Sequence, residues 1–267
     1  MSGPFFPWTV PMSSLAADTT GPAAGSPPDR PAARRAGAVA QGVALALGLV
    51  LLLGGFGLIA VDYRPYTVPT GSMEPTVAAN DKVLARKVGG AAVGRGDVVV
   101  FHDRTWGTET MVKRVIGIGG DTVVCCDAQG HLSVNGSPID EPYLNRNPLQ
   151  GVTPLASTSF TATVPTGRLF VLGDNRVGSQ DSRVHLDQLA GTVATTDVLG
   201  RVEATVWPVA RTGMLGRTAA FDALGGAGDD RSGPLEPAAY AMLAGAALIV
   251  LTSLAGSLAG LARRLRG

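Results

Sequence analysis

The chain has 267 residues, which is enough for one sizeable domain or two small ones. Its formal net charge of +1 produces no strong field of either sign, so we expect no nucleic-acid partner and no acidic substrate. Only 16% of the residues are charged, fewer than in a typical soluble protein. The excess of apolar residues should therefore be concentrated in particular segments.

Residues 1–35 are rich in Pro and Ala and have no hydrophobic period, which predicts a disordered tail. The apolar run at residues 36–61 contains Gln41 as its only clearly polar residue and is long enough to cross a membrane as a helix. A cleaved secretory signal shares the order of basic and then apolar residues. This run is longer than the apolar core of such a signal, and the small-residue pattern before Asp62 is poor, so we predict an uncleaved anchor.

A second uncharged apolar run covers residues 237–262, which favours a transmembrane helix over a buried helix of a soluble protein. A short basic tail, residues 263–267, follows it. Arginines thus flank the outer ends of both runs: Arg30, Arg34 and Arg35 before the first, and Arg263, Arg264 and Arg266 after the second. The positive-inside rule then predicts a multi-pass protein of the cell membrane, with both termini in the cytoplasm and residues 62–236 on the other side of the lipid bilayer.

Between these runs the pattern changes to short segments rich in β-branched residues, separated by Gly-rich turns. Asn135-Gly136 is a typical two-residue hairpin turn, and residues 140–158 are predicted to be a loop or an insertion. No helical period is visible, so we predict a mainly β fold, a folded sheet or barrel flanked by the two transmembrane helices. The predicted strands are Lys82–Lys87, Asp97–Phe101, Met111–Ile116, Asp121–Cys125, His131–Val134, Pro138–Ile139, Phe160–Val164, Leu169–Leu172 and Val198–Trp207.

The two cysteines, Cys125 and Cys126, are adjacent. Neighbouring side chains on a strand point to opposite faces, which favours a structural or free pair, while a strained disulfide between them stays open as the alternative. The three histidines are scattered: His102, His131 and His185. The sequence therefore predicts no metal site, and no cofactor is indicated.

The first segment that could carry chemistry is Pro69-Thr70-Gly71-Ser72-Met73-Glu74-Pro75-Thr76. Prolines restrict φ at both ends, and a glycine lets the backbone bend just before Ser72. A serine placed in this way can present its oxygen to a ligand. Taken alone, such a segment is more often a Pro/Gly turn with a surface serine.

A second candidate is Lys113, which lies among apolar residues in a predicted strand that should be largely buried. A lysine in such a strand normally extends its ammonium group to solvent. If it is buried instead, desolvation lowers the pKa of the amine and allows it to accept a proton from a serine hydroxyl near neutral pH.

A third candidate is the polar segment 173–183, which directly follows a predicted strand. Asp181 and Arg183 can form an ion pair that simply holds the loop. Ser179 and Ser182 are short polar groups that could orient an amine.

Together these segments resemble the conserved boxes of type I signal peptidases, the membrane-bound Ser/Lys endopeptidases of the bacterial kind. The order matches that family after an N-terminal anchor: Pro-x-Gly-Ser-Met-x-Pro-Thr, then Gly-Asp-Val-Val-x-Phe, then Lys-Arg-Val-Ile-Gly-x-x-Gly-Asp, then Gly-Asp-Asn-x-x-x-Ser-x-Asp-Ser-Arg. The closing Gly200-Arg201-Val202 and Trp207-Pro208 fit as well. A chance match to all four boxes in this order is very improbable.

The resemblance implies that Ser72 is the nucleophile and Lys113 the general base. Thr70 stands where the family often has Ser, and its hydroxyl would stabilise the oxyanion beside the backbone N–H of Ser72. No histidine occupies the base position, whereas signal peptidases of the endoplasmic-reticulum and archaeal kind have His there. The implied supporting residues are Ser179, which would hold the lysine amine, and the structural pair Asp181 and Arg183.

The implied activity is removal of signal peptides from secretory pre-proteins, after small residues at −1 and −3 (the Ala-x-Ala type), through an ester on Ser72. Shallow apolar pockets would exclude larger side chains. An extended substrate added to a β edge would present residues −1 and −3 to the same face, because strand side chains alternate. We expect the enzyme to be a monomer.

This chain differs from well-known members of the family because its second span follows the catalytic region, and its long tail has no counterpart in the motif set. An anchored β-domain that binds peptides without cleaving them would lack one member of the dyad, and both are present. A self-cleaving Ser/Lys repressor would need a helix-turn-helix, which residues 1–61 do not offer. A peptidase dedicated to one assembly substrate stays open beside a general enzyme.

Overall fold

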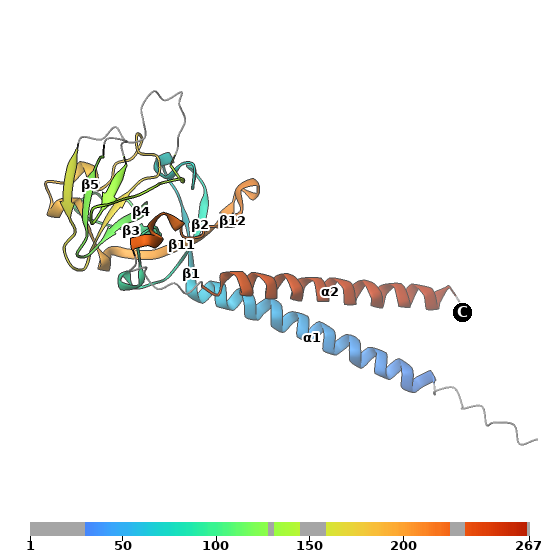
Figure 1. Ribbon diagram of the computed structural model, residues 1–267. Helices are drawn as coiled ribbons and strands as arrows, with labels where there is room; N and C mark the ends of the chain where they lie inside the picture. The colour runs from blue at the N-terminus through green and yellow to red at the C-terminus, as the bar shows by residue number, and fades with distance from the viewer. Residues whose placement is uncertain (1–29, 128–130, 145–158, 225–232, 266–267) are drawn as a thin grey trace, which may run out of the picture.

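The computed structural model describes residues 30–127, 131–144, 159–224 and 233–265. Figure 1 shows a β-rich domain from which two long helices extend side by side, α1 (Arg30–Asp62) and α2 (Leu235–Arg264). Most of the predicted tail lies outside the described residues. The helix begins at Arg30, so the last residues of the segment predicted as disordered continue the apolar helix instead.

Residues 35–62 and 235–262 are each long and apolar enough to span a membrane. Glycines bring the two helices into close contact: a Cβ on Gly245 would lie 2.5 Å from the carbonyl oxygen of Gly48, and one on Gly55 would lie 2.5 Å from that of Ala238. The ends of the helices that are remote from the domain lie on the same side of the molecule (Figure 1). The two predicted transmembrane runs are thus both found as long apolar helices.

The larger sheet is antiparallel throughout and has the strand order β1-β2-β11-β3-β4-β9-β10, with β12 paired to β11. Register shifts within β11 and between β4 and β9 allow the sheet to bend. Its strands are β1 (Tyr63–Thr67), β2 (Lys82–Arg86), β3 (Val98–Phe101), β4 (Met111–Ile118), β9 (Arg168–Leu172), β10 (Val193–Ala194), β11 (Val198–Trp207) and β12 (Gly213–Met214).

The second sheet is smaller, with the order β7-β6-β5-β8. Its strands are β5 (Thr122–Cys125), β6 (Leu132–Val134), β7 (Ser137–Pro138) and β8 (Phe160–Thr163). Asn135 and Gly136 connect β6 to β7 with φ values of 54° and 79°, the left-handed conformations that the predicted hairpin turn requires.

The apolar core lies on both faces of β3 and β4, so the centre of the large sheet is shielded from water. Along β3, Val98 and Val100 pack on one cluster, while Val99 and Phe101 pack on another. A third cluster joins the two sheets through Ile116, Val123 and Phe170. This double burial explains why β3 is a continuous apolar run in the sequence.

The predicted mainly β fold flanked by two helices is confirmed, and each predicted strand corresponds to an observed one. Most of the predicted loop, residues 145–158, lies outside the described residues. Cys125 and Cys126 are joined by a disulfide. The favoured prediction of a free or structural pair is therefore wrong, and the alternative, a disulfide between the two residues, is found. β5 ends at Cys125, and Cys126 is therefore not held on the opposite face as it would be within a strand.

Candidate active site

Ser72 lies in a single 3-10 turn, Gly71–Met73, in the connection between β1 and β2. The base of this connection is closed by two backbone hydrogen bonds, Val68 N to Asp81 O (2.9 Å) and Asn80 N to Val68 O (2.8 Å). Met73 is fully buried in the core cluster under the turn. Anchoring one residue after the serine in the core fixes where the hydroxyl can point.

Lys113 lies on β4, between β3 and β9 in the interior of the large sheet, and only 4% of its surface is exposed. Its Nζ forms a hydrogen bond with Ser72 Oγ at 2.8 Å and lies 3.2 Å from the carbonyl oxygen of Val112. The buried strand predicted from the sequence therefore does bury this lysine. The structure brings the predicted nucleophile and the predicted base into direct contact.

Burial lowers the pKa of the Lys113 amine from 10.5 to about 8. The carboxylates of Asp181 and Asp174 oppose this shift because they favour the ammonium form, and the Arg183 guanidinium adds slightly to it. Desolvation dominates. The amine can therefore lose its proton under mildly alkaline conditions and act as a base.

Thr70 precedes the 3-10 turn, and its exposed side chain donates a hydrogen bond to Ser72 Oγ at 3.2 Å. The serine, the lysine and this threonine open into one cavity of about 240 Å³. Two extended segments form its walls, and the lining residues are Val68, Pro69, Thr70, Ser72, Glu109, Thr110, Met111, Val112 and Lys113. A peptide chain entering this cavity would meet both members of the dyad.

Ser179 is buried beside Gly173, so close that a Cβ on Gly173 would lie 2.2 Å from Ser179 Oγ. Within the described part of the chain, this hydroxyl makes no hydrogen bond of normal geometry, although it is near enough to the Asp181 carboxylate to help lower the pKa of that group. The bond to the Lys113 amine that the sequence predicted is therefore not formed in this structure. The role of Ser179 as the residue that holds the lysine stays a prediction.

Asp181 and Arg183 form the ion pair expected from the sequence, with Arg183 Nε 2.8 Å from Asp181 Oδ1. The buried carboxylate also accepts the backbone N–H of Gly173 at 3.0 Å. Burial alone would raise the pKa of Asp181, but Arg183 and the Gly173 N–H outweigh it and hold the pKa below its usual value. These contacts fit the predicted supporting role.

A second buried ion pair, Arg114 with Asp174, was not assigned from the sequence. Arg114 follows the lysine on β4, and it holds both oxygens of Asp174 at 2.8 and 2.6 Å. Thr76 donates its hydroxyl to the same carboxylate at 2.5 Å. The pair thus ties the strand that carries the lysine to the segment that carries the serine. All three residues stand inside the motifs quoted above, and that position was the only signal of their importance.

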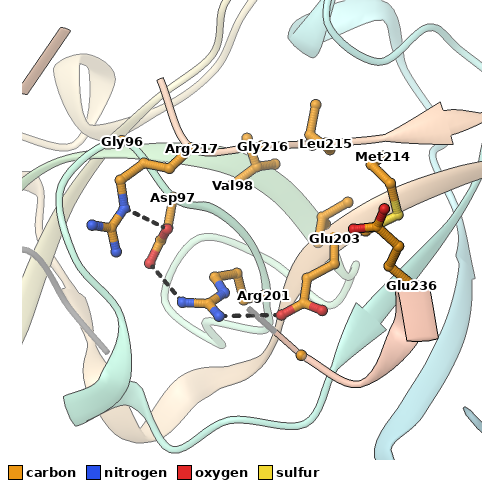
Figure 2. Close-up of a pocket in the computed structure, with 12 residues that line it drawn as sticks. Gly96, Asp97, Val98, Arg201, Glu203, Met214, Leu215, Gly216, Arg217 and Glu236 are labelled. Carbon is orange, nitrogen blue, oxygen red and sulfur yellow. Dashed lines mark hydrogen bonds and ion pairs between the residues drawn. The ribbon is translucent and has the colours of Figure 1, made fainter. Parts of the chain in front are cut away.

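Another cavity, of about 290 Å³, lies between β3, β11 and the start of α2 (Figure 2). Its charged side chains face one another: Arg217 Nε lies 3.3 Å from Asp97, and Arg201 lies 3.6 Å from Asp97 and 3.1 Å from Glu203. Neither dyad residue lines this cavity. The predicted nucleophile and the predicted base both line the smaller cavity instead.

Residues 40–207 match the family described as "Signal peptidase, peptidase S26". A signal peptidase I of Mycobacterium tuberculosis is 30% identical, over 74% of this chain and 83% of its own length. A signal peptidase I of Leptolyngbya laminosa is 31% identical, over 76% of this chain and 98% of its own. A crystal structure of a signal peptidase I from Enterococcus faecalis V583 is 33% identical and covers 40% of this chain and 93% of its own, with a TM-score of 0.33.

Proposed function

Because this chain belongs to the signal peptidase family, peptidase S26, we propose that Ser72 and Lys113 are the residues with which it cleaves signal peptides. The activity itself, a serine endopeptidase acting on secretory pre-proteins, follows from that membership. The observation that supports the assignment is the 2.8 Å contact between a buried lysine amine and a serine hydroxyl at the edge of a cavity.

In this mechanism the neutral amine of Lys113 takes the proton of Ser72 while Oγ attacks the carbonyl carbon of the small residue at −1. Collapse of the tetrahedral intermediate breaks the peptide bond, and the lysine gives its proton to the departing amine, which becomes the new amino terminus of the mature protein. The signal peptide stays as an ester on Ser72. Lys113 then deprotonates a water molecule, which hydrolyses the ester and regenerates the serine.

Two donors would stabilise the oxyanion, the backbone N–H of Ser72 and the hydroxyl of Thr70. The Thr70 hydroxyl at present donates to Ser72 Oγ. When Oγ becomes bonded to carbon, the same hydroxyl is within reach of the oxygen attached to that carbon. Thr70 would therefore act mainly in the transition state rather than in substrate binding.

Replacing Thr70 with Val is expected to lower kcat by about 10- to 10³-fold and to change KM little, because an oxyanion donor acts on the transition state. The matched control is Thr161→Val, which makes the same change at an exposed residue of β8 that does not line this cavity, and it should keep kcat within about twofold. Steady-state kinetics on an Ala-x-Ala peptide would measure both. An unchanged kcat in the Thr70 variant would remove this residue from the oxyanion site.

The membrane arrangement is proposed on charge and geometry. The arginines stand at the outer ends of both helices, and those ends lie on the same side of the molecule (Figure 1). Both termini would then be cytoplasmic, with the β domain outside the lipid bilayer, where signal peptides emerge during export. One chain holds every residue of the proposed site, which supports a monomeric enzyme.

Cleavage of a purified pre-protein by the full chain in detergent tests the assignment. The product should begin directly after an Ala-x-Ala sequence, as read by mass spectrometry of its new amino terminus. Substituting a large residue at −1 should stop cleavage, since the cavity is small and mostly apolar. Binding of the precursor without any cleavage would instead favour the peptide-binding alternative.

A further inference from the structure

The single turn that carries Ser72 makes few hydrogen bonds of its own. Glu74 N closes the turn by donating to Gly71 O at 3.1 Å, and just beyond it Val77 N donates to Met73 O at 3.0 Å. One helical turn cannot hold a fixed orientation by such bonds alone, because helix formation becomes favourable only over several turns. The orientation of the peptide groups around Ser72 must therefore be set from outside the turn.

Asn175, which follows β9 in the polar segment 173–183, supplies two of these outside contacts. Its backbone N–H donates to Ser72 O at 3.0 Å, and its side-chain Nδ2 donates to Gly71 O at 3.1 Å. The carbonyls on both sides of Ser72 are thus held by one residue that lies about a hundred positions further along the chain. On its other side, Asn175 Oδ1 accepts the N–H of Gly178 at 3.3 Å.

The bond to Gly71 matters because Gly71 O and the N–H of Ser72 belong to the same peptide group. A peptide group is planar, with the carbonyl and the N–H pointing in opposite directions, so fixing one fixes the other. Hydrogen bonding to the carbonyl also polarises the peptide group and makes its N–H a stronger donor. The amide of Asn175 therefore acts directly on the N–H assigned above to the oxyanion.

The side-chain amide can act in only one orientation. The carbonyl of Gly71 accepts and cannot donate, so it must face the NH₂ of Asn175, and the amide oxygen must face the Gly178 N–H. An aspartate at this position would keep the shape and the contact with Gly178, but it would set a carboxylate oxygen against the Gly71 carbonyl. The donor would be lost while the volume is preserved.

We propose that Asn175 is a positioning residue that aims the Ser72 N–H at the oxyanion, an assignment that rests on Ser72 being the nucleophile. Within the residues that the structure describes, Asn175 forms no hydrogen bond with Lys113, and it does not line the substrate cavity. Its loss should consequently affect stabilisation of the transition state, and leave both the pKa of the base and the affinity for substrate near their normal values.

The test uses the full chain in detergent with Asn175→Ala and Asn175→Asp, and Gln180→Ala as the control, an exposed amide in the same segment. We expect both Asn175 variants to lower kcat by about 10- to 100-fold with KM within about twofold, less than complete removal of an oxyanion donor would cost. The control should keep full activity. Thermal unfolding of each variant confirms that the chain is folded during the assay.

Two further readouts separate positioning from a structural role. A peptide aldehyde of the Ala-x-Ala type adds Ser72 Oγ to its carbonyl carbon and places an oxygen in the oxyanion site. Its inhibition constant should therefore rise by the same factor as kcat falls. In Asn175→Ala, the apparent pKa of the pH–rate profile should equal that of the unaltered enzyme, because Lys113 is untouched.

An unchanged kcat in Asn175→Ala, or unfolding of both variants, would overturn the proposal, and so would a fall in kcat with unchanged aldehyde inhibition or a shifted apparent pKa. Ser72→Ala is assayed in parallel. If it is inactive while Asn175→Ala is fully active, only the positioning role fails. If Ser72→Ala retains turnover, the proposed nucleophile itself is wrong.

Discussion

Replacing Ser72 with Ala is expected to lower kcat on an Ala-x-Ala precursor by at least about 10⁴-fold, because no ester can form without Oγ. Replacing Lys113 with Met should cause a loss of the same order, since a serine hydroxyl is a poor nucleophile without a base. Residues that act as one unit are not additive, so the double variant should be no less active than either single one. Single-turnover cleavage, followed by mass spectrometry, measures these losses.

Matched controls are available in the same domain. Lys82→Met and Ser137→Ala make similar changes at exposed residues that do not line the cavity and should retain full activity. Turnover that persists in either dyad variant, with the controls unaffected, would reject the dyad.

Lys113→Met should also make the chain more stable at neutral pH. The folded pKa of the amine, about 8, lies below its ordinary 10.5, so the unfolded chain binds more protons between these values. Below about pH 8 the native state carries a buried ammonium group, which costs about 3 kcal/mol of stability. The variant avoids this cost but loses the hydrogen bond to Ser72, worth roughly 1 kcal/mol, and the difference is its net gain in stability. The gain should shrink as the pH rises and turn into a slight loss of stability above the unfolded pKa, because only the lost hydrogen bond then remains. Thermal unfolding at pH 7 and at pH 10.5 tests this, and lower stability of the variant at pH 7 would contradict it.

Replacing Arg114 with Leu is expected to destabilise the domain by about 3–5 kcal/mol, because it leaves the Asp174 carboxylate buried without its partner. Asp174 is 1% exposed and Arg114 is 2% exposed, so neither group can turn to water. For a domain of this size the thermal midpoint should fall by roughly 6–20 °C. The double change Arg114→Met with Asp174→Leu should recover much of this loss, because it removes both charges together.

Asp127→Asn provides the comparison for this stability experiment. Asp127 pairs with His131 at 3.1 Å, and both side chains are at least one-third exposed. Exposed pairs contribute about 1 kcal/mol or less, so the midpoint should move little. A similar small effect for Arg114→Leu would show that the Arg114–Asp174 pair does not hold the two segments together.

The strands of the large sheet could be predicted because β3 and β4 are buried on both faces, which makes β3 a continuous apolar run and β4 rich in apolar residues around Lys113 and Arg114. β1 escaped detection because Pro65 interrupts its pattern, and proline is tolerated there since β1 lies at the edge of the sheet. β10 and β12 have two residues each, too few for any period to appear. The single turn around Ser72 is too short for the same reason.

At the site, the contact between Ser72 and Lys113 could be predicted because both lie in motifs with a known order. The bonds of Asn175 to the carbonyls of Gly71 and Ser72 could not. A hydrogen bond from a side chain to a distant backbone carbonyl leaves no periodic trace in a sequence, and it depends on how the loops pack. The same holds for Thr76 and Asp174, which meet across 98 positions of the chain.

If burial lowers the pKa of Lys113 so that it works as a neutral amine, the pH dependence of kcat/KM must show it. This quantity reports the ionisation of the free enzyme. We expect kcat/KM to rise about tenfold per pH unit up to an apparent pKa of about 8 and then to level off. A profile that is flat from neutral pH upward, or one that levels off only near the ordinary lysine pKa of 10.5, would contradict it.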